Sequence, residues 1–189
     1  MKYSEKPHRS ALRRGRTSLP NHAYFITKCL LRPGTNILAI PACAEIVINS
    51  LLWARDNGWW RILGFVIMMD HYHVIIGLGE VKTLSDAIAG LSKYTARLIN
   101  EHLGREGPLW EESFYDHLLR DREDFDGILA YIHWNPVERG LVQAPEDWPY
   151  STANERFAGE IDWDWIGHSV VFPGGGTRWS ANRAPLQYW

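Results

Sequence analysis

Cysteine is scarce in this sequence, since only Cys29 and Cys43 occur among its 189 residues. Two cysteines cannot form the disulfide framework of a small secreted domain, and neither has a second cysteine or a histidine nearby at metal-ligand spacing. Both stand in apolar runs, so we expect buried free thiols in a reducing compartment. The cysteine content therefore excludes a disulfide scaffold.

Long hydrophobic runs are also missing. No segment approaches the roughly 18 uninterrupted apolar residues that a membrane span requires, and the best run, Ile62 to Met69, has only the length of a strand. The N-terminus is basic but lacks the apolar segment of a secretory signal. We therefore expect a cytoplasmic protein without a membrane partner.

The net charge is small, at −2, and the hydrophobic and charged fractions of 46% and 22% are typical of globular domains. No internal repeat or low-complexity tract occurs. These features exclude collagen-like, coiled-coil and wholly disordered chains. A chain of this size buries roughly 70% of its unfolded surface, which is enough for one domain with a real core.

Charge is distributed unevenly despite the small total. Residues 1–32 contain eight Lys and Arg against one Glu, a net charge of +7, so the remainder carries −9. A basic arm on an acidic body is typical of proteins that bind a polyanion, although solubility alone also explains such a pattern. We divide the chain into a basic arm (1–20), a folded domain (21–150) and a C-terminal tail rich in Trp, Gly and Pro (151–189).

Hydrophobic periodicity predicts seven elements in the folded domain. Strands are predicted over 22–31, 60–68, 71–78 and 110–119, and helices over 41–56, 84–103 and 124–135. Asp124 is the expected cap of the last helix, and Asn135-Pro136 its expected end, because a residue before proline disfavours helical angles. This order predicts an α+β fold: a ferredoxin-like (RRM-like) antiparallel sheet with helices packed on one side.

His71 and His73 are the first candidates for chemistry. They are separated by one residue in a predicted strand, so both imidazoles project from the same face while Tyr72 points to the other. This separation suits two ligands of one divalent metal. Two ordinary surface or core histidines are the alternative, and the pattern alone does not decide between them.

Tyr131 and Asn135 form the second candidate pair. They lie one helical turn apart at the edge of an apolar stripe, where side chains lean toward the sheet and remain reachable from a cleft. An ordinary helix tyrosine and a C-terminal asparagine are the alternative. A free tyrosine has a pKa of about 10 and is a poor nucleophile, but a cation that polarises a phosphate makes its attack feasible.

Four motifs in order carry a family resemblance. They are His71-Tyr72-His73, Trp110 with SFYDHLLR (113–120), YIHWNPV (131–137) and WPYST (148–152). Together they resemble the motifs of the REP-associated tyrosine transposases, a branch of the single-tyrosine HUH transposases of bacterial insertion sequences. The run GRTSLPNHAYFIT (15–27) resembles the opening of that branch, and the similarity extends over residues 15–167.

The resemblance implies an activity and a site. The family cleaves single-stranded DNA beside a small hairpin, leaving a 5′-phosphotyrosine link and a free 3′-OH, and rejoins it by the reverse reaction. Its nucleophile corresponds to Tyr131, and its ligands for Mg²⁺ or Mn²⁺ correspond to His71, His73 and Asn135. Two imidazoles also tolerate Zn²⁺, and members act as a monomer or a homodimer. We therefore expect hairpin DNA of bacterial repetitive elements as the partner.

Two positions depart from the family pattern. Tyr72 is bulkier and more polar than the usual aliphatic residue between the histidines, and Met69-Asp70 replaces the common proline followed by Asn or Glu. The second departure bears on the turn that presents His71. Neither removes a group that the chemistry requires.

Basic residues and one further histidine are expected to bind DNA, with an ordinary solvated or structural face as the alternative. They are Arg13, Arg14, Arg16, Lys93, Arg97, His117, Arg120 and Arg122. One or two of the ten tryptophans are expected to stack on unpaired bases. Two rival functions remain open: a domesticated hairpin-binding protein that no longer cleaves DNA, and an unrelated metal hydrolase that uses the same histidines.

Overall fold

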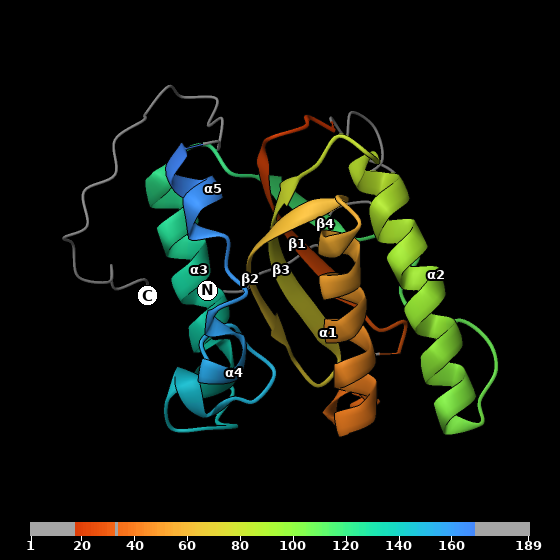
Figure 1. Cartoon of the computed structure of the whole chain (residues 1–189). Coiled ribbons are helices and arrows are strands. Elements are labelled where there is room, and N and C mark those ends of the chain that lie inside the picture. Colours follow the sequence, from red (N-terminus) through yellow and green to blue (C-terminus); the bar gives the residue numbers. More distant parts are fainter. Residues whose placement is uncertain (1–17, 33, 169–189) are drawn as a thin grey trace, which may run out of the picture.

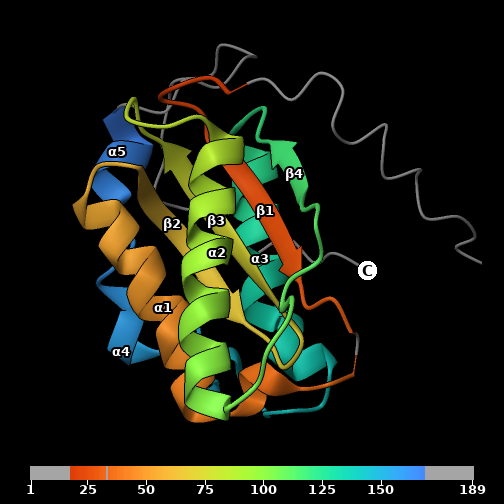
Figure 2. The same ribbon diagram turned by 90° about the vertical axis from the view of Figure 1, so that its right-hand side faces the viewer.

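Four strands form one sheet, and three of them are apolar runs. In the computed structural model, which describes residues 18–32 and 34–168, they are β1 (Ala23–Cys29), β2 (Trp60–Ile67), β3 (His71–Leu78) and β4 (Tyr115–Leu118). Neighbouring strands run antiparallel in the order β2-β3-β1-β4 (Figures 1 and 2). The α+β class and the antiparallel sheet are confirmed.

The register of the sheet aligns three residues that matter for the site. Thr27 of β1 lies opposite His73 of β3 on one side and opposite Tyr115 of β4 on the other. Directly opposed residues project from the same face of a sheet. These three side chains therefore form one row across β3, β1 and β4.

The strand predicted over residues 110–119 is shorter than expected. Trp110 makes only an isolated bridge with Leu30, and β4 begins at Tyr115. The ammonium group of Lys28 donates to the backbone carbonyls of Glu111, at 2.5 Å, and Ser113, at 3.2 Å. These bonds hold the segment before β4 against β1, together with the bond from the Glu111 N–H to Cys29 O at 3.0 Å.

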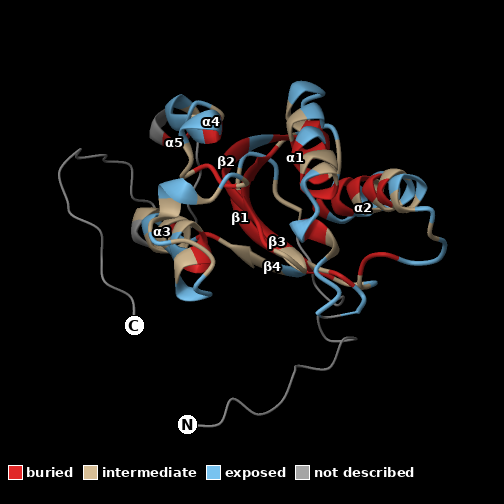
Figure 3. Ribbon diagram, turned by 90° about the horizontal axis from the view of Figure 1, so that it is seen from below, coloured by how far each residue is buried: buried red, intermediate tan, exposed pale blue. Residues whose placement is uncertain are grey.

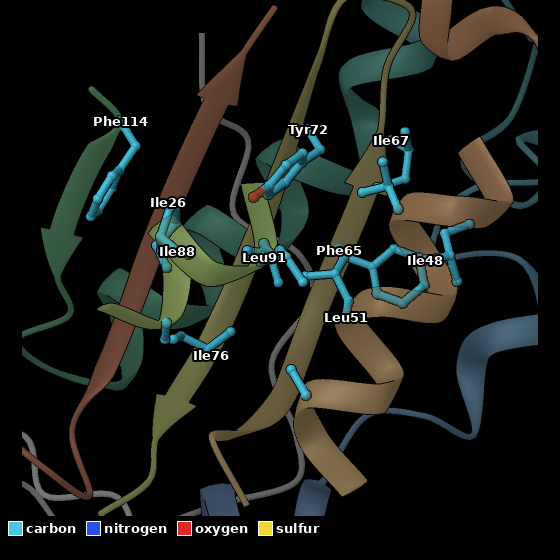
Figure 4. Close-up of a cluster of buried hydrophobic side chains, with 14 of the residues drawn as sticks. Ile26, Ile48, Leu51, Phe65, Ile67, Tyr72, Ile76, Ile88, Leu91 and Phe114 are labelled. Carbon is cyan, nitrogen blue, oxygen red and sulfur yellow. The ribbon is translucent and has the colours of Figure 1, made fainter. Parts of the chain in front are cut away.

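One face of the sheet packs against α1 (Pro41–Asp56) and α2 (Leu84–Leu103), with the 3₁₀ turn η2 (Ile37–Ala39) before α1. Both helices match their predicted bounds. Thr83 caps α2 by accepting from the Asp86 N–H at 3.1 Å, and Gly104 ends it with a φ of 60°. Figure 4 shows Tyr72 among the aliphatic side chains of this face, so the unusual residue between the histidines lies in the core.

The other face is covered by α3 (Arg122–Glu138) and α5 (Trp163–His168). Figure 3, viewed from below, shows helices on both sides of the buried strands. The prediction that helices cover one side only is therefore wrong. The reason lies in the strands: β2 and β3 are apolar at nearly every position, and a strand buried on both faces has this pattern.

Both predicted boundaries of α3 are also wrong. Its cap is Asp121, whose carboxylate accepts from the Asp124 N–H at 2.8 Å, and the helix continues through Pro136. A proline three residues from a helix end removes only one intrahelical bond. Gly140, with a φ of 67°, and the bond from Leu141 N–H to Pro136 O at 2.9 Å then terminate the helix.

Residues 145–168 run along β2 and contain η3 (Pro145–Asp147) and α4 (Glu155–Ala158) as well as α5. Ser151 bridges Val66, and the Thr152 hydroxyl accepts from the Phe65 N–H at 3.0 Å. The arm residues Arg13, Arg14 and Arg16 and most of the expected C-terminal tail lie outside the described residues. Within the described part, no helix has the length and apolarity needed to cross a membrane.

Candidate active site

The two histidines of β3 direct their Nε2 atoms toward the same point. His71 Nδ1 lies 2.7 Å from Asp70 Oδ1, and His73 Nδ1 lies 2.8 Å from the Thr27 hydroxyl. Their Nε2 atoms face each other at 3.2 Å. Because an ionised carboxylate only accepts, Asp70 assigns the His71 proton to Nδ1 and leaves the Nε2 lone pair free.

This spacing fits a shared cation. Metal–nitrogen bonds to histidine measure about 2.0–2.1 Å, and two such bonds to atoms 3.2 Å apart enclose an angle of about 100°. This angle lies between the octahedral and the tetrahedral value. Both Nε2 atoms are thus placed where one metal ion could bind them.

Burial keeps His73 in the form that binds metal. The side chain is almost fully buried, and this burial, with the nearby charges of His71 and Arg139, lowers the pKa of His73 to about 3. Burial is the largest single influence on Asp70 and raises its pKa, but the hydrogen bond and charge of His71, the Gly34 backbone and the charge of Arg139 together outweigh it and leave the pKa below its usual value. A neutral imidazole is the form of histidine that binds a metal.

Tyr131 of α3 lies directly beside the histidine pair. Its ring centroid is 5.5 Å from that of His73 and 6.3 Å from that of Phe25, and 43% of the residue is exposed. Burial and the charge of Glu138 raise the pKa of Tyr131, against the opposing effects of Asn135 and Arg139. The phenol is therefore protonated at neutral pH yet reachable from solvent.

Asn135 completes the group with an unused oxygen. The residue is only 4% exposed and hydrogen-bonds the Tyr131 side chain, whereas its Oδ1 has no hydrogen-bond partner among the described residues. A buried amide oxygen without a partner is costly, and binding a cation would remove that cost. The residues present therefore fit a divalent metal.

The candidate metal ligands are two histidines and one asparagine. No cluster of three or more His, Cys, Asp or Glu suited to a metal occurs in the described part of the chain. The histidine pair supplies two such ligands, and the third candidate is the amide of Asn135. Its hard oxygen favours Mg²⁺ or Mn²⁺, and the two imidazoles also suit Zn²⁺.

The residues expected to bind DNA fall into two groups. His117 lies on β4 with its Nε2 2.9 Å from Asp124 Oδ2, and Arg120 and Arg122 flank the start of α3. Lys93 and Arg97 stand on α2, which covers the opposite face of the sheet. The fold thus brings His117, Arg120 and Arg122 to the side of the histidine pair and leaves the two α2 cations behind the sheet.

Sequence patterns did not reveal four residues around the site: Asp70, Thr27, Phe25 and Arg139. Asp70 adjoins His71 in the chain, so a search for carboxylates beside candidate ligands would find it. Thr27 and Phe25 contact His73 only through the pairing of β1 with β3, which no local pattern reveals. Arg139 acts through its charge on His73, Asp70 and Tyr131.

Comparisons with known proteins identify relatives of this chain. The family model described as "Transposase IS200 like" matches residues 45–135, a segment that contains both histidines, Tyr131 and Asn135. The chain is 34% identical to a protein of Haemophilus influenzae, over 55% of this chain and 66% of that relative. It is 28% identical to a protein of Escherichia coli K12, over 69% of this chain and 78% of that relative. Both relatives carry the name REP-associated tyrosine transposase.

A solved structure shows the same fold. It is described as a REP-associated tyrosine transposase bound to a REP hairpin, and it aligns with a TM-score of 0.64 at 24% identity. The alignment covers 87% of this chain and 97% of that one.

Proposed function

Because this chain is related to the REP-associated tyrosine transposases, we propose that it cleaves and rejoins single-stranded DNA at hairpin-forming repeats. Tyr131 is the nucleophile and forms a 5′-phosphotyrosine link. The observation that carries the proposal is the position of this exposed phenol beside two converging Nε2 atoms and an unpaired buried amide oxygen.

Three side chains would hold the metal. His71 and His73 would offer their Nε2 atoms, since the Nδ1 atoms of the two rings already bond to Asp70 and Thr27, and Asn135 would offer its Oδ1. When bound, a divalent cation withdraws charge from the phosphate and neutralises the charge that develops during attack. We propose Mg²⁺ or Mn²⁺ as that cation.

The chemistry exchanges one phosphoester for another. The Tyr131 oxygen forms a bond to phosphorus and loses its proton to solvent, while the bond from phosphorus to the 3′ oxygen breaks and the 3′ oxygen takes up a proton. Attack by a 3′-OH on the phosphotyrosine reverses these changes and releases the phenol. Since one phosphodiester replaces another in each direction, rejoining needs no external energy source.

Two neighbours assist the nucleophile. The hydrogen bond from Asn135 and the positive charge of Arg139 both lower the pKa of Tyr131, and so both favour the phenolate that develops during attack. They oppose the burial and the Glu138 charge that raise this pKa. Asn135 would therefore have a double role, since it hydrogen-bonds Tyr131 and its unpaired Oδ1 would be available to the cation.

The substitution Tyr131→Phe tests the assignment. The variant should bind a labelled repeat hairpin as the parent does but lose nicking and the denaturant-stable protein–DNA adduct, because only the hydroxyl oxygen is removed. Binding is measured by gel shift, and adducts by denaturing electrophoresis with Mg²⁺ or Mn²⁺. Tyr94→Phe, on α2 behind the sheet, is the matched control and should cut normally.

Each rival function predicts a different result. Normal cutting by Tyr131→Phe without an adduct would indicate an unrelated metal hydrolase. Hairpin binding by the parent protein without metal-dependent nicking of any repeat near the gene would indicate a binding protein that no longer cleaves.

A further inference from the structure

An exposed tyrosine on β4 lies on the same face as the proposed nucleophile. Tyr115 begins β4 and is 49% exposed. It pairs with Thr27, which in turn pairs with His73, so the three side chains share one row and one face. Two strand spacings of about 4.8 Å place Tyr115 roughly 10 Å from His73 across the sheet.

Phe25 connects this residue to the site. Its ring centroid is 6.1 Å from that of Tyr115, 6.3 Å from that of Tyr131 and 5.3 Å from that of His73. Phe25 itself is buried, whereas both tyrosines are half exposed. The face therefore presents a continuous aromatic floor that leads from the proposed cleavage site toward the β4 edge of the sheet.

Basic side chains border this floor. His117 follows on the same face of β4, because it pairs with Phe25. The Arg120 guanidinium at the start of α3 is largely exposed, although it lies 3.7 Å from Asp124. An aromatic surface beside cations is the arrangement by which proteins hold unpaired nucleotides, since bases stack on the ring and phosphates contact the charges.

We propose that Tyr115 is a stacking platform for an unpaired base near the scissile phosphate, a nucleobase subsite distinct from the metal ligands and the nucleophile. This inference rests on the proposed function, which supplies the single strand. At about 3.4 Å per stacked nucleotide, the distance of roughly 10 Å corresponds to a base within about three nucleotides of the cleaved bond.

Sheet formation alone does not require an aromatic residue here. Valine and threonine also favour strands, and half of the Tyr115 surface contributes nothing to the core. Substitution by valine therefore removes the stacking surface while preserving the preference for a strand. Phenylalanine and tryptophan preserve both.

The test uses two probes in a Tyr131→Phe background, which prevents cleavage. One is the hairpin copied from the inverted repeat nearest the gene, with a single-stranded extension that contains 2-aminopurine, and the other is the same hairpin without the extension. Tyr115→Val should weaken binding of the extended probe by about 5- to 150-fold, abolish the quenching of 2-aminopurine and leave the bare hairpin unaffected. Tyr115→Phe and Tyr115→Trp should retain both signals.

Tyr94→Val is the matched control. Tyr94 is 51% exposed but lies on α2 behind the sheet, so both probes should bind this variant as they bind the parent. Thermal unfolding of each variant verifies that the fold is intact.

Two results would overturn the inference. If Tyr115→Val binds the extended probe and quenches it as the parent does, no base stacks on Tyr115. If it weakens both probes equally, Tyr115 supports the strand or the hairpin instead. The proposed function is tested separately. The parent protein, which has Tyr131, should form the covalent adduct on the extended probe. A Tyr115-dependent quench without any adduct would refute cleavage while the stacking subsite stands.

Discussion

At the scale of single residues, Asp70 governs which nitrogen of His71 faces the cation position. Its carboxylate lies 2.7 Å from Nδ1, so the proton resides there and Nε2 is free. Carboxylates in this position also make the imidazole more basic and hold its ring orientation. Asp70 is one of the two departures from the family pattern, and its geometry gives it a positioning role at the proposed metal site.

The substitution Asp70→Asn should weaken Mn²⁺ binding by about 10- to 100-fold. A neutral amide can still accept the Nδ1–H bond, but it no longer adds negative charge beside the imidazole. Isothermal titration calorimetry in the absence of DNA measures this effect independently of catalysis.

Asp56→Asn provides the control for this experiment. Asp56 forms an exposed pair with Arg55 at the end of α1, so its replacement removes the same charge without touching the site. Equal Mn²⁺ affinity in the parent and Asp70→Asn proteins would show that Asp70 does not position His71.

At the scale of elements, the attachment of α5 to the sheet depends on a residue without a side chain. A Cβ on Gly77 of β3 would lie 2.2 Å from the Trp165 ring of α5. The glycine thus leaves the space into which the tryptophan packs. Trp165 in turn adjoins the cluster of Ile161 and Ile166 that covers β2.

Gly77→Ala should therefore destabilise the protein by about 1–3 kcal/mol, as overpacking does in other cores. The double variant Gly77→Ala/Trp165→Leu should lose less free energy of unfolding than the two single variants lose together, because the smaller leucine side chain leaves room for the alanine methyl group. Urea unfolding measures all four proteins.

Gly159→Ala is the matched control for the clash. A Cβ at Gly159 meets no atom within 4 Å among the described residues, and its φ of −75° suits any residue. Additive effects of the Gly77 and Trp165 substitutions would show that α5 does not dock as the structure indicates.

At the scale of the whole molecule, charge and chemistry lie in different parts of the chain. Residues 1–32 carry +7 and the remainder −9, while the proposed metal ligands and nucleophile lie on β3 and α3. A net charge of −2 is therefore no argument against a DNA partner. Affinity for the phosphate backbone is expected to depend strongly on the basic arm.

Replacement of Arg13, Arg14 and Arg16 by glutamine should weaken hairpin binding and reduce its salt dependence. Removing one cation from a DNA phosphate reduces the slope of log K against log salt by about 0.9 on duplex DNA. Fluorescence anisotropy across a salt series measures the slope, and the adduct formed at saturating DNA should be unchanged. An identical slope would place the phosphate-binding cations elsewhere on the protein.

Lys93→Gln combined with Arg97→Gln provides the comparison. This pair lies on α2, on the face of the sheet opposite the histidines. A larger effect on the salt slope from this pair than from the arm would locate the hairpin on the α2 side.

The sequence by itself determined the local elements and the types of residue at the site. Apolar runs identified the strands, the Thr83 cap and Gly104 bounded α2, and His71, Tyr72 and His73 had to alternate between faces because successive side chains of a strand do so. Tyr131 and Asn135 had to lie one turn apart because residues four positions apart in a helix are neighbours on its surface. Each of these features depends on residues that are neighbours in the chain.

Only the tertiary structure decided what those residues meet. The pairing of β1 with β3 brings Thr27 to His73, the pairing of β1 with β4 adds Tyr115 to the row, and the packing of α3 brings Tyr131 to the histidines. It also placed α3 and α5 on the second face of the sheet, where the order of elements predicts no helix. Such contacts join segments tens of residues apart. The apolar runs of β2 and β3 indicate that both sheet faces are buried, but they do not specify which helix covers which face.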